Sequence, residues 1–207
     1  TIREIHHRVK NNLQTVAALL RMQARRTTSV DARSALEEAM RRVGTIATVH
    51  EALSQTIDEI VDFDVVFGRT LRLAVDVAAS ESRVRMVREG SYGKLAATEA
   101  TALAVVLTEL VSNAVEHGLA GGDGTVTVTA NREGRDLTVT VSDDGVGIDL
   151  TAKPTGTGLG MQIVRTMVAG ELRGSISWQQ TEGGGTTVTI QARLGYAPPS
   201  DGEREQF

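Results

Sequence analysis

Two acidic residues and two glycines, Asp143-Asp144-Gly145-Val146-Gly147, follow a segment that alternates apolar and polar residues. That segment, residues 137–142, and a similar one at residues 125–130 predict a β-hairpin. Glycine lacks a Cβ, so the backbone can approach a flat ligand closely, and a carboxylate at a strand end can accept hydrogen bonds from an exocyclic amine such as that of adenine. Taken alone, such a segment is most often a turn. The neighbouring segments of the chain therefore decide whether this one is only a turn or a loop that binds a base such as adenine.

A second glycine-rich segment, Gly156-Thr157-Gly158-Leu159-Gly160, opens a helix that we expect to continue to about Ala169. Backbone amides at a helix N-terminus are a natural phosphate site. The chain has no GxxxxGK[ST] loop, and its glycines do not follow a strand-to-helix GxGxxG layout, so neither a Walker nor a Rossmann interpretation fits. Beyond this helix, strands predicted at residues 175–180 and 186–192 flank Gly183-Gly184-Gly185, and residues 196–207 are predicted to be a flexible tail.

A long helix is predicted upstream, from about Ala96 to His117, after a helix at residues 65–79 and a short strand at residues 84–88. Glu109 and Asn113 are four residues apart and therefore share a polar edge of the long helix. One Asn carbonyl can suffice for Mg²⁺, which fills its shell with phosphate oxygens and water. Glu109 could orient or deprotonate a nucleophile. The alternative is that both side chains belong to an ordinary solvated face.

The first 54 residues predict a helical hairpin. Residues 1–26 carry one narrow apolar stripe, and a second helix, with Asp31 as its expected N-cap, continues to about Ser54. Two such helices cannot cover their own apolar seams, so we expect a homodimeric four-helix bundle. The stripe contains Ile2, Ile5, Val9, Leu13, Val16 and Leu20.

Two neighbouring histidines on the first helix differ in their expected environment. At about 100° per residue, with the stripe centred near Val9, His6 lies roughly 60° from the centre and His7 roughly 160° away. His7 therefore faces solvent, and a phosphate on it would meet cationic and amide donors. The alternative is that both are ordinary helix histidines. The exposed face around His7 also carries Arg3, Lys10, Asn11 and Gln14.

Composition narrows the possible classes of protein. The 207 residues, 41% of them hydrophobic, can form packed cores in two unequal modules, and the absence of cysteine excludes disulfides and cysteine chemistry. No apolar run reaches the roughly 18 residues of a membrane span, and no signal peptide is visible, so the cytoplasm is the default. Residues 1–50 are basic, with nine Lys and Arg against four Asp and Glu, but aromatic residues make up only 3% of the chain, which disfavours direct nucleic-acid binding. The chain opens in mid-helix, so we expect an upstream region, such as a sensor.

The order of these segments is more specific than any one of them. Glu109 to Ala114, Asp143 to Gly147, Gly156 to Gly160 and Gly183 to Thr186 resemble the N, G1, G2 and G3 boxes of the Bergerat (GHKL) ATPase fold, an α/β sandwich, over residues 65–194. Residues 4–14 resemble the dimerisation and phosphoacceptor region of the HisKA_2/HWE branch of sensor histidine kinases. The expected organisation is a phosphotransfer hairpin at 1–56, an ATP-binding domain at 62–195 and a tail at 196–207.

The resemblance implies a role for each matching residue. His7 becomes the phosphoacceptor, Asn113 the Mg²⁺ ligand and Asp143 the residue that recognises adenine. The implied activity is ATP-dependent autophosphorylation in a homodimer, followed by transfer to an aspartate of a response regulator in two-component signalling. Further implied nucleotide contacts are His117, the close-approach glycines Gly145 and Gly147, the phosphate-lid hinge of Gly156, Gly158, Leu159 and Gly160, and Thr186, which supports Asp143 through water.

Three departures from the family pattern leave alternatives open. Arg8 follows His7 where the commonest histidine kinases have an acidic base, so Glu109 inherits that role. Glu116 stands where many N boxes carry a cation, which leaves Lys153 or an arginine to neutralise phosphate charge. The lid at residues 148–155 is short and lacks a phenylalanine motif. The alternatives to a histidine kinase are a nucleotide-binding scaffold without turnover and a Bergerat-fold ATPase or serine kinase.

Overall fold

A computed structural model of the chain divides into two compact units, Thr1–Asp58 and Glu59–Phe207, which are considered separately. It describes residues 2–54, 60–65, 67–68, 83–120, 122–147, 159–181 and 183–197. The side chains of residues 2–10, of Leu159 and of several positions in the second helix lie outside this description. The expected boundaries at 1–56, 62–195 and 196–207 stay predictions.

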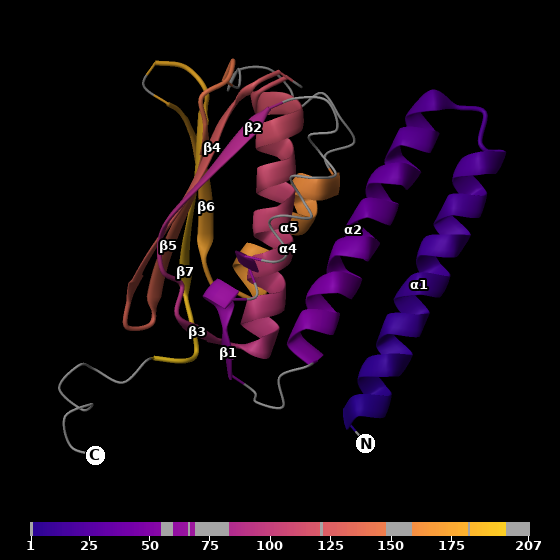
Figure 1. Cartoon of the computed structure of the whole chain (residues 1–207), viewed down its shortest axis with the longest axis horizontal. Helices are drawn as coiled ribbons and strands as arrows, with labels where there is room; N and C mark the ends of the chain where they lie inside the picture. Colours follow the sequence, from indigo (N-terminus) through magenta and orange to yellow (C-terminus); the bar gives the residue numbers. More distant parts are fainter. Residues whose placement is uncertain are drawn as a thin grey trace. The chain divides into compact units, whose positions relative to one another are not determined.

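The first unit is a helical hairpin, as the hydrophobic period predicts. α1 (Ile2–Arg26) and α2 (Val30–Ser54) pack against each other and are joined by a short turn (Figure 1). Most described side chains of α1 are exposed, and Ala24 is buried. Large apolar side chains remain exposed on α1, at Val16, Leu19 and Met22. The hairpin therefore leaves apolar surface uncovered.

The second helix begins two residues earlier than expected. The Ser29 carbonyl accepts the first helical hydrogen bond, from the Arg33 amide, and the Ser29 hydroxyl accepts one from the Ala32 amide at 3.4 Å. Ser29 is therefore the N-cap, and the expectation for Asp31 was wrong. Asp31 lies instead in the first turn, where a carboxylate interacts favourably with the helix dipole.

Replacing Ser29 with alanine should destabilise the hairpin by about 0.5–1 kcal/mol, because the Ala32 amide loses its side-chain acceptor and the bond it loses is long. The measurement is thermal unfolding followed by the helical signal in far-ultraviolet circular dichroism. Ser34→Ala makes the same chemical change inside α2 and should not lower the transition. Equal losses in the two variants would contradict the capping role.

The second unit is a two-layer α/β sandwich. Its described strands form a five-stranded sheet in the order β2-β4-β5-β7-β6, in which β2 and β4 are parallel and the other pairs antiparallel. Helices α4 (Ala97–Asn113) and α5 (Leu159–Gly170) lie on one face of this sheet (Figure 1). A separate small sheet pairs β1 with β3. The strands are β1 (Ile60–Asp62), β2 (Val84–Gly90), β3 (Lys94–Ala96), β4 (Gly124–Glu133), β5 (Asp136–Asp143), β6 (Ser175–Gln180) and β7 (Thr186–Arg193).

The predicted strands of the large sheet are all present, and several are longer than expected. The hairpin strands extend to Glu133 and Asp136 because Gly134 adopts a positive φ of 58° and closes a tight turn. The parallel partnership of β2 with β4 and the small β1–β3 sheet were not predicted. The predicted helix at residues 65–79 lies largely outside the described residues.

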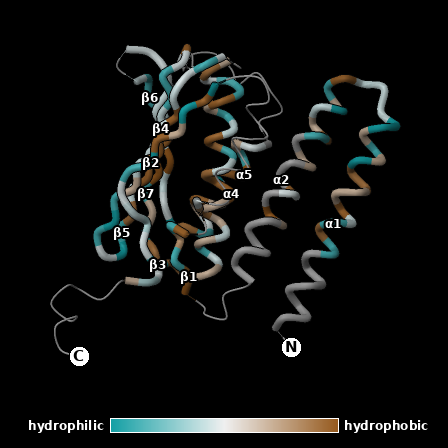
Figure 2. Tube along the Cα trace, viewed as in Figure 1, coloured by the Kyte–Doolittle hydropathy of each residue, from teal (hydrophilic) through white to brown (hydrophobic). Residues whose placement is uncertain are grey.

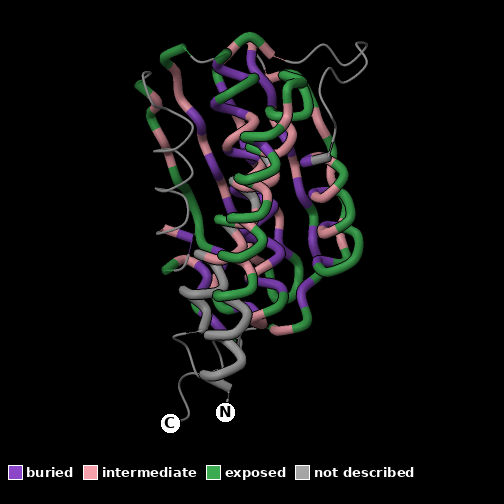
Figure 3. The backbone as a smooth tube through the Cα atoms, turned by 90° about the vertical axis from the view of Figure 1, so that its right-hand side faces the viewer, coloured by how far each residue is buried: buried purple, intermediate pink, exposed green. Residues whose placement is uncertain are grey.

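The core of this unit lies between α4 and the sheet. Inward-facing residues alternate along β4, β5 and β7, as the two-residue period of a strand requires. Hydrophobic stretches mark these strands and α4, and buried residues are concentrated in this unit (Figures 2 and 3). The packing places the C-terminal ends of α4 and β5 at one edge of the sandwich. Its fully buried large side chains include Leu103, Val106, Leu107, Leu137 and Ile190.

α4 and the turn that follows it, Ala97–Gly118, form the one described helical segment long and apolar enough to pass a test for a membrane span. The sandwich buries 72% of that window. Such burial is typical of a helix in the core of a folded domain. Length and composition alone are weak support for a membrane span.

Candidate functional site

Asp143 ends β5 and is almost completely buried, with 5% of its surface exposed. Its Oδ1 atom accepts a hydrogen bond from the Gly145 amide at 3.1 Å, and the Thr186 amide also donates to the carboxyl group. Burial raises the pKa of Asp143, and these two hydrogen bonds partly offset the rise. The carboxyl group is thus held in a fixed orientation at the sheet edge.

Backbone from two other segments lies directly against Asp143. A Cβ on Gly118 would stand 2.6 Å from the Asp143 carboxyl, and one on Gly185 would stand 2.0 Å from the Asp143 carbonyl oxygen. A Cβ on Gly145 would stand 1.9 Å from the Gly118 carbonyl oxygen, which accepts a hydrogen bond from the Val146 amide at 2.9 Å. Only glycine fits at these positions, so the end of α4 and the loop after β5 form one compact structure.

The triple-glycine segment closes the same edge. Gly183, Gly184 and Gly185 have φ values of 90°, 109° and 84°, which L residues rarely adopt. Gly147 also has a positive φ, 76°, and a Cβ there would stand 3.0 Å from the Gly185 carbonyl oxygen. The predicted glycine segments after β5 and before β7 are therefore brought together.

Thr186 supplies an unsatisfied polar atom beside Asp143. The side chain is 5% exposed, and its buried Oγ1 atom has no hydrogen-bond partner within the part of the chain that the structure describes. Buried hydroxyls are normally hydrogen-bonded. A carboxylate acceptor and a hydroxyl that both donates and accepts fit an adenine amine and the ring nitrogen beside it, directly or through water. These residues therefore suit the base of ATP.

We expect Gly185→Ala to destabilise the sandwich by about 2–4 kcal/mol, because the new Cβ would combine a strained φ with a clash against the Asp143 carbonyl. Urea unfolding monitored by Trp178, the single tryptophan of the chain, reports on this unit. Gly183→Ala is the matched control, since a Cβ there has a positive φ but meets no atom. Equal destabilisation by the two variants would show that the contact with Asp143 is unimportant.

Only some of the residues predicted to contact the phosphates lie within the described ranges. Glu109 and Asn113 are half-buried on α4, and Glu116 and His117 are exposed in η1 (Ala114–Gly118), a π-helical turn that continues α4. The sequence predicts an ordinary helix to His117, and the wider turn re-aims these last side chains. Gly160 is buried at the start of α5. Gly156, Gly158 and Lys153 lie outside the described residues, as does the side chain of Leu159.

One residue of the site was not predicted from the sequence. Gly118 ends η1 and contacts the Asp143 carboxyl, whereas the predicted helix ended before it. The signal was a glycine directly after the last helical histidine, a common way to end a helix. His7 belongs to α1, in the other unit, and its side chain is outside the description.

Two family models match successive parts of the chain. Residues 4–77 match HisKA_2, described as histidine kinase, and residues 98–195 match HATPase_c, described as histidine kinase-, DNA gyrase B- and HSP90-like ATPase. The chain therefore belongs to the histidine kinase family, with an ATP-binding domain of the HATPase_c type after its HisKA_2 region.

Among characterised relatives, the chain is similar to the sensor histidine kinase PdtaS. It is 50% identical over 198 residues to PdtaS of Mycolicibacterium smegmatis and of Mycobacterium tuberculosis. The match covers 94% of this chain and 40% of each relative. The chain thus spans less than half the length of these relatives.

Solved structures show the same fold. The histidine kinase domain of the Erythrobacter litoralis EL346 blue-light activated histidine kinase matches with a TM-score of 0.64 at 18% identity, covering 87% of this chain and 96% of that one. The catalytic domain of histidine kinase ThkA matches with a TM-score of 0.55 at 20% identity, covering 65% of this chain and 94% of that one. At this identity the likeness concerns the fold alone.

Proposed function

We propose that this kinase core autophosphorylates on His7 with ATP bound beside Asp143, and then passes the phosphoryl group to an aspartate of a response regulator. The observation that carries the proposal is the buried Asp143 carboxyl, enclosed by the backbone of Gly118, Gly145 and Gly185. It is flanked by the Thr186 hydroxyl, which has no hydrogen-bond partner among the described residues. A carboxylate fixed at a strand end, with backbone on several sides, suits a flat base that carries an amine.

Asp143 and Thr186 would bind the base, and the end of α4 would face the phosphates. Asn113 would hold Mg²⁺ through its side-chain oxygen, and the metal would neutralise phosphate charge. Mg²⁺ typically takes one or two protein oxygens and completes its shell with phosphate oxygens and water. His117 and the glycines from Gly156 to Gly160 would complete the contacts to the nucleotide.

In the proposed reaction, a neutral imidazole nitrogen of His7 attacks the γ-phosphorus of ATP in line. The new nitrogen–phosphorus bond forms as the bond from phosphorus to the β,γ-bridging oxygen breaks, and ADP leaves. The proton of the imidazole goes to Glu109, which is half-buried four residues before Asn113. Positioning and charge stabilisation supply most of the acceleration, as in other phosphoryl transfers.

The helical hairpin supports the proposed assembly. Val16, Leu19 and Met22 expose apolar surface on α1, and a second copy of the hairpin would cover it in a four-helix bundle. The receiver domain of the response regulator would dock on this bundle. We place the complex in the cytoplasm, without direct nucleic-acid binding.

Incubation of the chain with γ-labelled ATP and Mg²⁺ tests the proposal. Label that is stable in alkali and labile in acid is expected, because a phosphoramidate has this stability and a phosphate ester does not. Nucleotide binding without label, with and without a receiver domain, would favour a scaffold. Acid-stable label on a partner would favour a serine kinase.

A further inference from the structure

A polar row crosses β5, β7 and β6 on the face of the sheet that the helices cover, at the candidate nucleotide site. Thr186 of β7 pairs with Gln180 of β6, and the Thr186 amide donates to the Asp143 carboxyl at the end of β5. Side chains of directly paired residues point to the same face of a sheet. The next two rows on this face are apolar across the same strands: Val141, Val188 and Trp178, then Val139, Ile190 and Ile176.

Gln180 is the outermost member of this polar row, at the end of the edge strand β6. Trp178, two residues earlier, faces α5, because the Arg165 guanidinium lies over its ring, 4.5 Å from the ring centroid. The Gln180 side chain therefore points to the same, helix-covered side. A Cβ on Gly147 would stand 3.4 Å from Gln180 Nε2, so the carboxamide lies against the loop that follows Asp143.

The polar groups of Gln180 and Thr186 are available to a ligand. The Gln180 side chain is exposed, and its carboxamide makes no hydrogen bond within the described ranges. The Thr186 Oγ1 atom beside it is buried and also lacks a partner among the described residues. Buried hydroxyls are normally hydrogen-bonded, and an amide supplies both a donor and an acceptor. A ligand at this edge of the sheet can therefore bond to both side chains.

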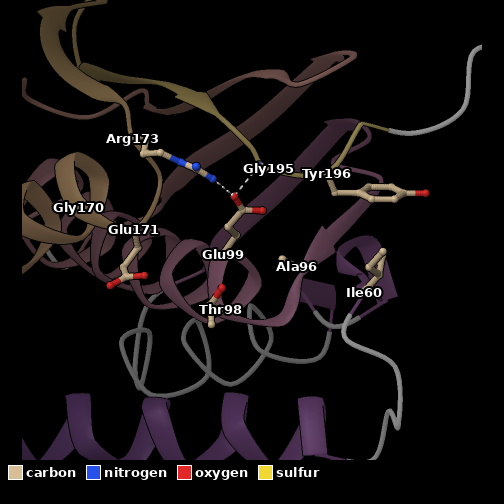
Figure 4. A pocket seen from close by; sticks show the side chains of 9 residues that line it. All are labelled: Ile60, Ala96, Thr98, Glu99, Gly170, Glu171, Arg173, Gly195 and Tyr196. Carbon is tan, nitrogen blue, oxygen red and sulfur yellow. Dashed lines mark hydrogen bonds and ion pairs between the residues drawn. The ribbon is translucent and has the colours of Figure 1, made fainter.

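The cavity at the start of α4, by contrast, does not call for a ligand. Glu99 lines it, and the Glu99 Oε1 atom accepts hydrogen bonds from Arg173 Nη2 at 2.8 Å and from the Gly195 amide at 2.7 Å (Figure 4). The buried Oε2 atom of Glu99 and the buried Nη1 donor of Arg132 both lack a hydrogen-bond partner among the described residues, and the two side chains attract each other electrostatically. The charges of this cluster therefore compensate one another within the protein.

The order of the polar row matches the order of polar atoms along adenine. The exocyclic amine of adenine is a donor, and the ring nitrogen beside it, N1, is an acceptor. With the amine on Asp143, the side chains that follow in the row, Thr186 and Gln180, lie on the side of N1. The Thr186 hydroxyl and the Gln180 NH₂ group can both donate to N1, directly or through a shared water molecule.

We propose that Gln180 is a specificity-determining residue of the nucleotide site, whose carboxamide NH₂ group donates to N1 of adenine, directly or through a water molecule shared with Thr186. This inference rests on the proposed function, because it takes the position of the base from Asp143. The contact adds to the affinity for ATP and makes that affinity depend on an acceptor at N1.

Gln180→Leu removes the carboxamide at similar volume. Gln179→Leu is the matched control, because Gln179 is the adjacent residue of β6 and points to the face opposite the helices. ATP and 1-deaza-ATP, in which a CH group replaces N1, are titrated into each chain by calorimetry. We expect Gln180→Leu to weaken ATP binding about three- to tenfold, the contribution of one neutral hydrogen bond, and to leave 1-deaza-ATP binding within about twofold. Gln179→Leu should bind both nucleotides like the unmodified chain.

The pattern across the two nucleotides decides the role of Gln180. Unchanged ATP affinity in Gln180→Leu would overturn the proposal, and so would an equal loss for ATP and 1-deaza-ATP, because a purely structural role affects both. Asp143→Asn in the same titration distinguishes this failure from that of the proposed function. If Asp143→Asn binds ATP normally, the base does not lie beside Asp143 and both proposals fail. If Asp143→Asn weakens ATP binding and Gln180→Leu does not, only the role of Gln180 is excluded.

Gln180→Glu gives an independent measure. Glutamate keeps the size of glutamine but offers only acceptors when ionised, which oppose N1 of adenine and suit the N1–H group of inosine. The affinity for ATP relative to inosine triphosphate should therefore fall at least about threefold compared with the unmodified chain. An unchanged ratio in the folded variant would show that Gln180 does not face N1.

Discussion

His7→Gln is expected to abolish the acid-labile label that the chain acquires from γ-labelled ATP. Glutamine has no nucleophilic nitrogen comparable to an imidazole, so no nitrogen–phosphorus bond can form at this position. Its helix propensity is at least that of histidine, so α1 should be preserved. The measurement is the label retained on the chain after alkaline and after acid treatment, at equal protein and ATP concentrations.

His6→Gln is the matched control, because it makes the same substitution one residue earlier on α1. We expect it to retain most of the label, since adjacent positions on a helix point about 100° apart. Nucleotide affinity should be unchanged in both variants. Loss of label in His6→Gln with retention in His7→Gln would reassign the phosphoacceptor.

Asp143→Asn should weaken ATP binding by up to about a hundredfold, because a buried hydrogen-bonding group that loses its partner costs about 1–3 kcal/mol. The side-chain oxygen of the introduced asparagine would keep the bond that Oδ1 accepts from the Gly145 amide. Its NH₂ group would then replace Oδ2 and face the adenine amine, so that two donors would oppose each other. Calorimetric titration with ATP measures the loss. Asp144→Asn is the control, because Asp144 is exposed and its Oδ1 accepts only the Thr125 amide among the described contacts, a bond that asparagine retains.

Inosine triphosphate distinguishes lost recognition from lost structure. It carries an oxygen in place of the adenine amine, so the variant should lose its preference for ATP over this analogue, while the unmodified chain keeps it. The Asp143→Asn substitution should change the free energy of unfolding only slightly. Because burial raises the pKa of Asp143, its ionised form lowers stability as pH rises above the pKa of an unfolded aspartate, and asparagine removes that charge. A preference for ATP that survives in the variant would contradict the role of Asp143.

Most of the fold follows from periodicity in the sequence. The two-residue period identified the strands of the large sheet, and the long apolar stripe identified α4, because burial of one face imposes these periods. The small sheet was missed because β1 and β3 have three residues each, too few to show a period. The pairing of β2 with its parallel partner β4 also has no local signal in the sequence, because the connection between the two strands contains the whole of α4.

The candidate site was predictable where its residues are consecutive. Asp143 and its glycines follow a strand, so their place at the sheet edge could be inferred. Gly118 was missed because its requirement for glycine comes from Asp143, 25 positions further along the chain. Glu99 shows the same limit: a glutamate in the first turn of a helix is usually exposed, and only the tertiary fold buries it.

The parallel pairing of β2 with β4 also has a consequence for the order of assembly. The β4–β5 and β6–β7 hairpins join neighbouring segments, whereas Val84 must find Gly124 across the whole of α4. Closing the longer loop costs more entropy and slows the step. The hairpins should therefore form early, and β2, the edge strand nearer in sequence to the helical hairpin, should join late. Refolding from urea should reach full protection of the β2 amides after those of β5.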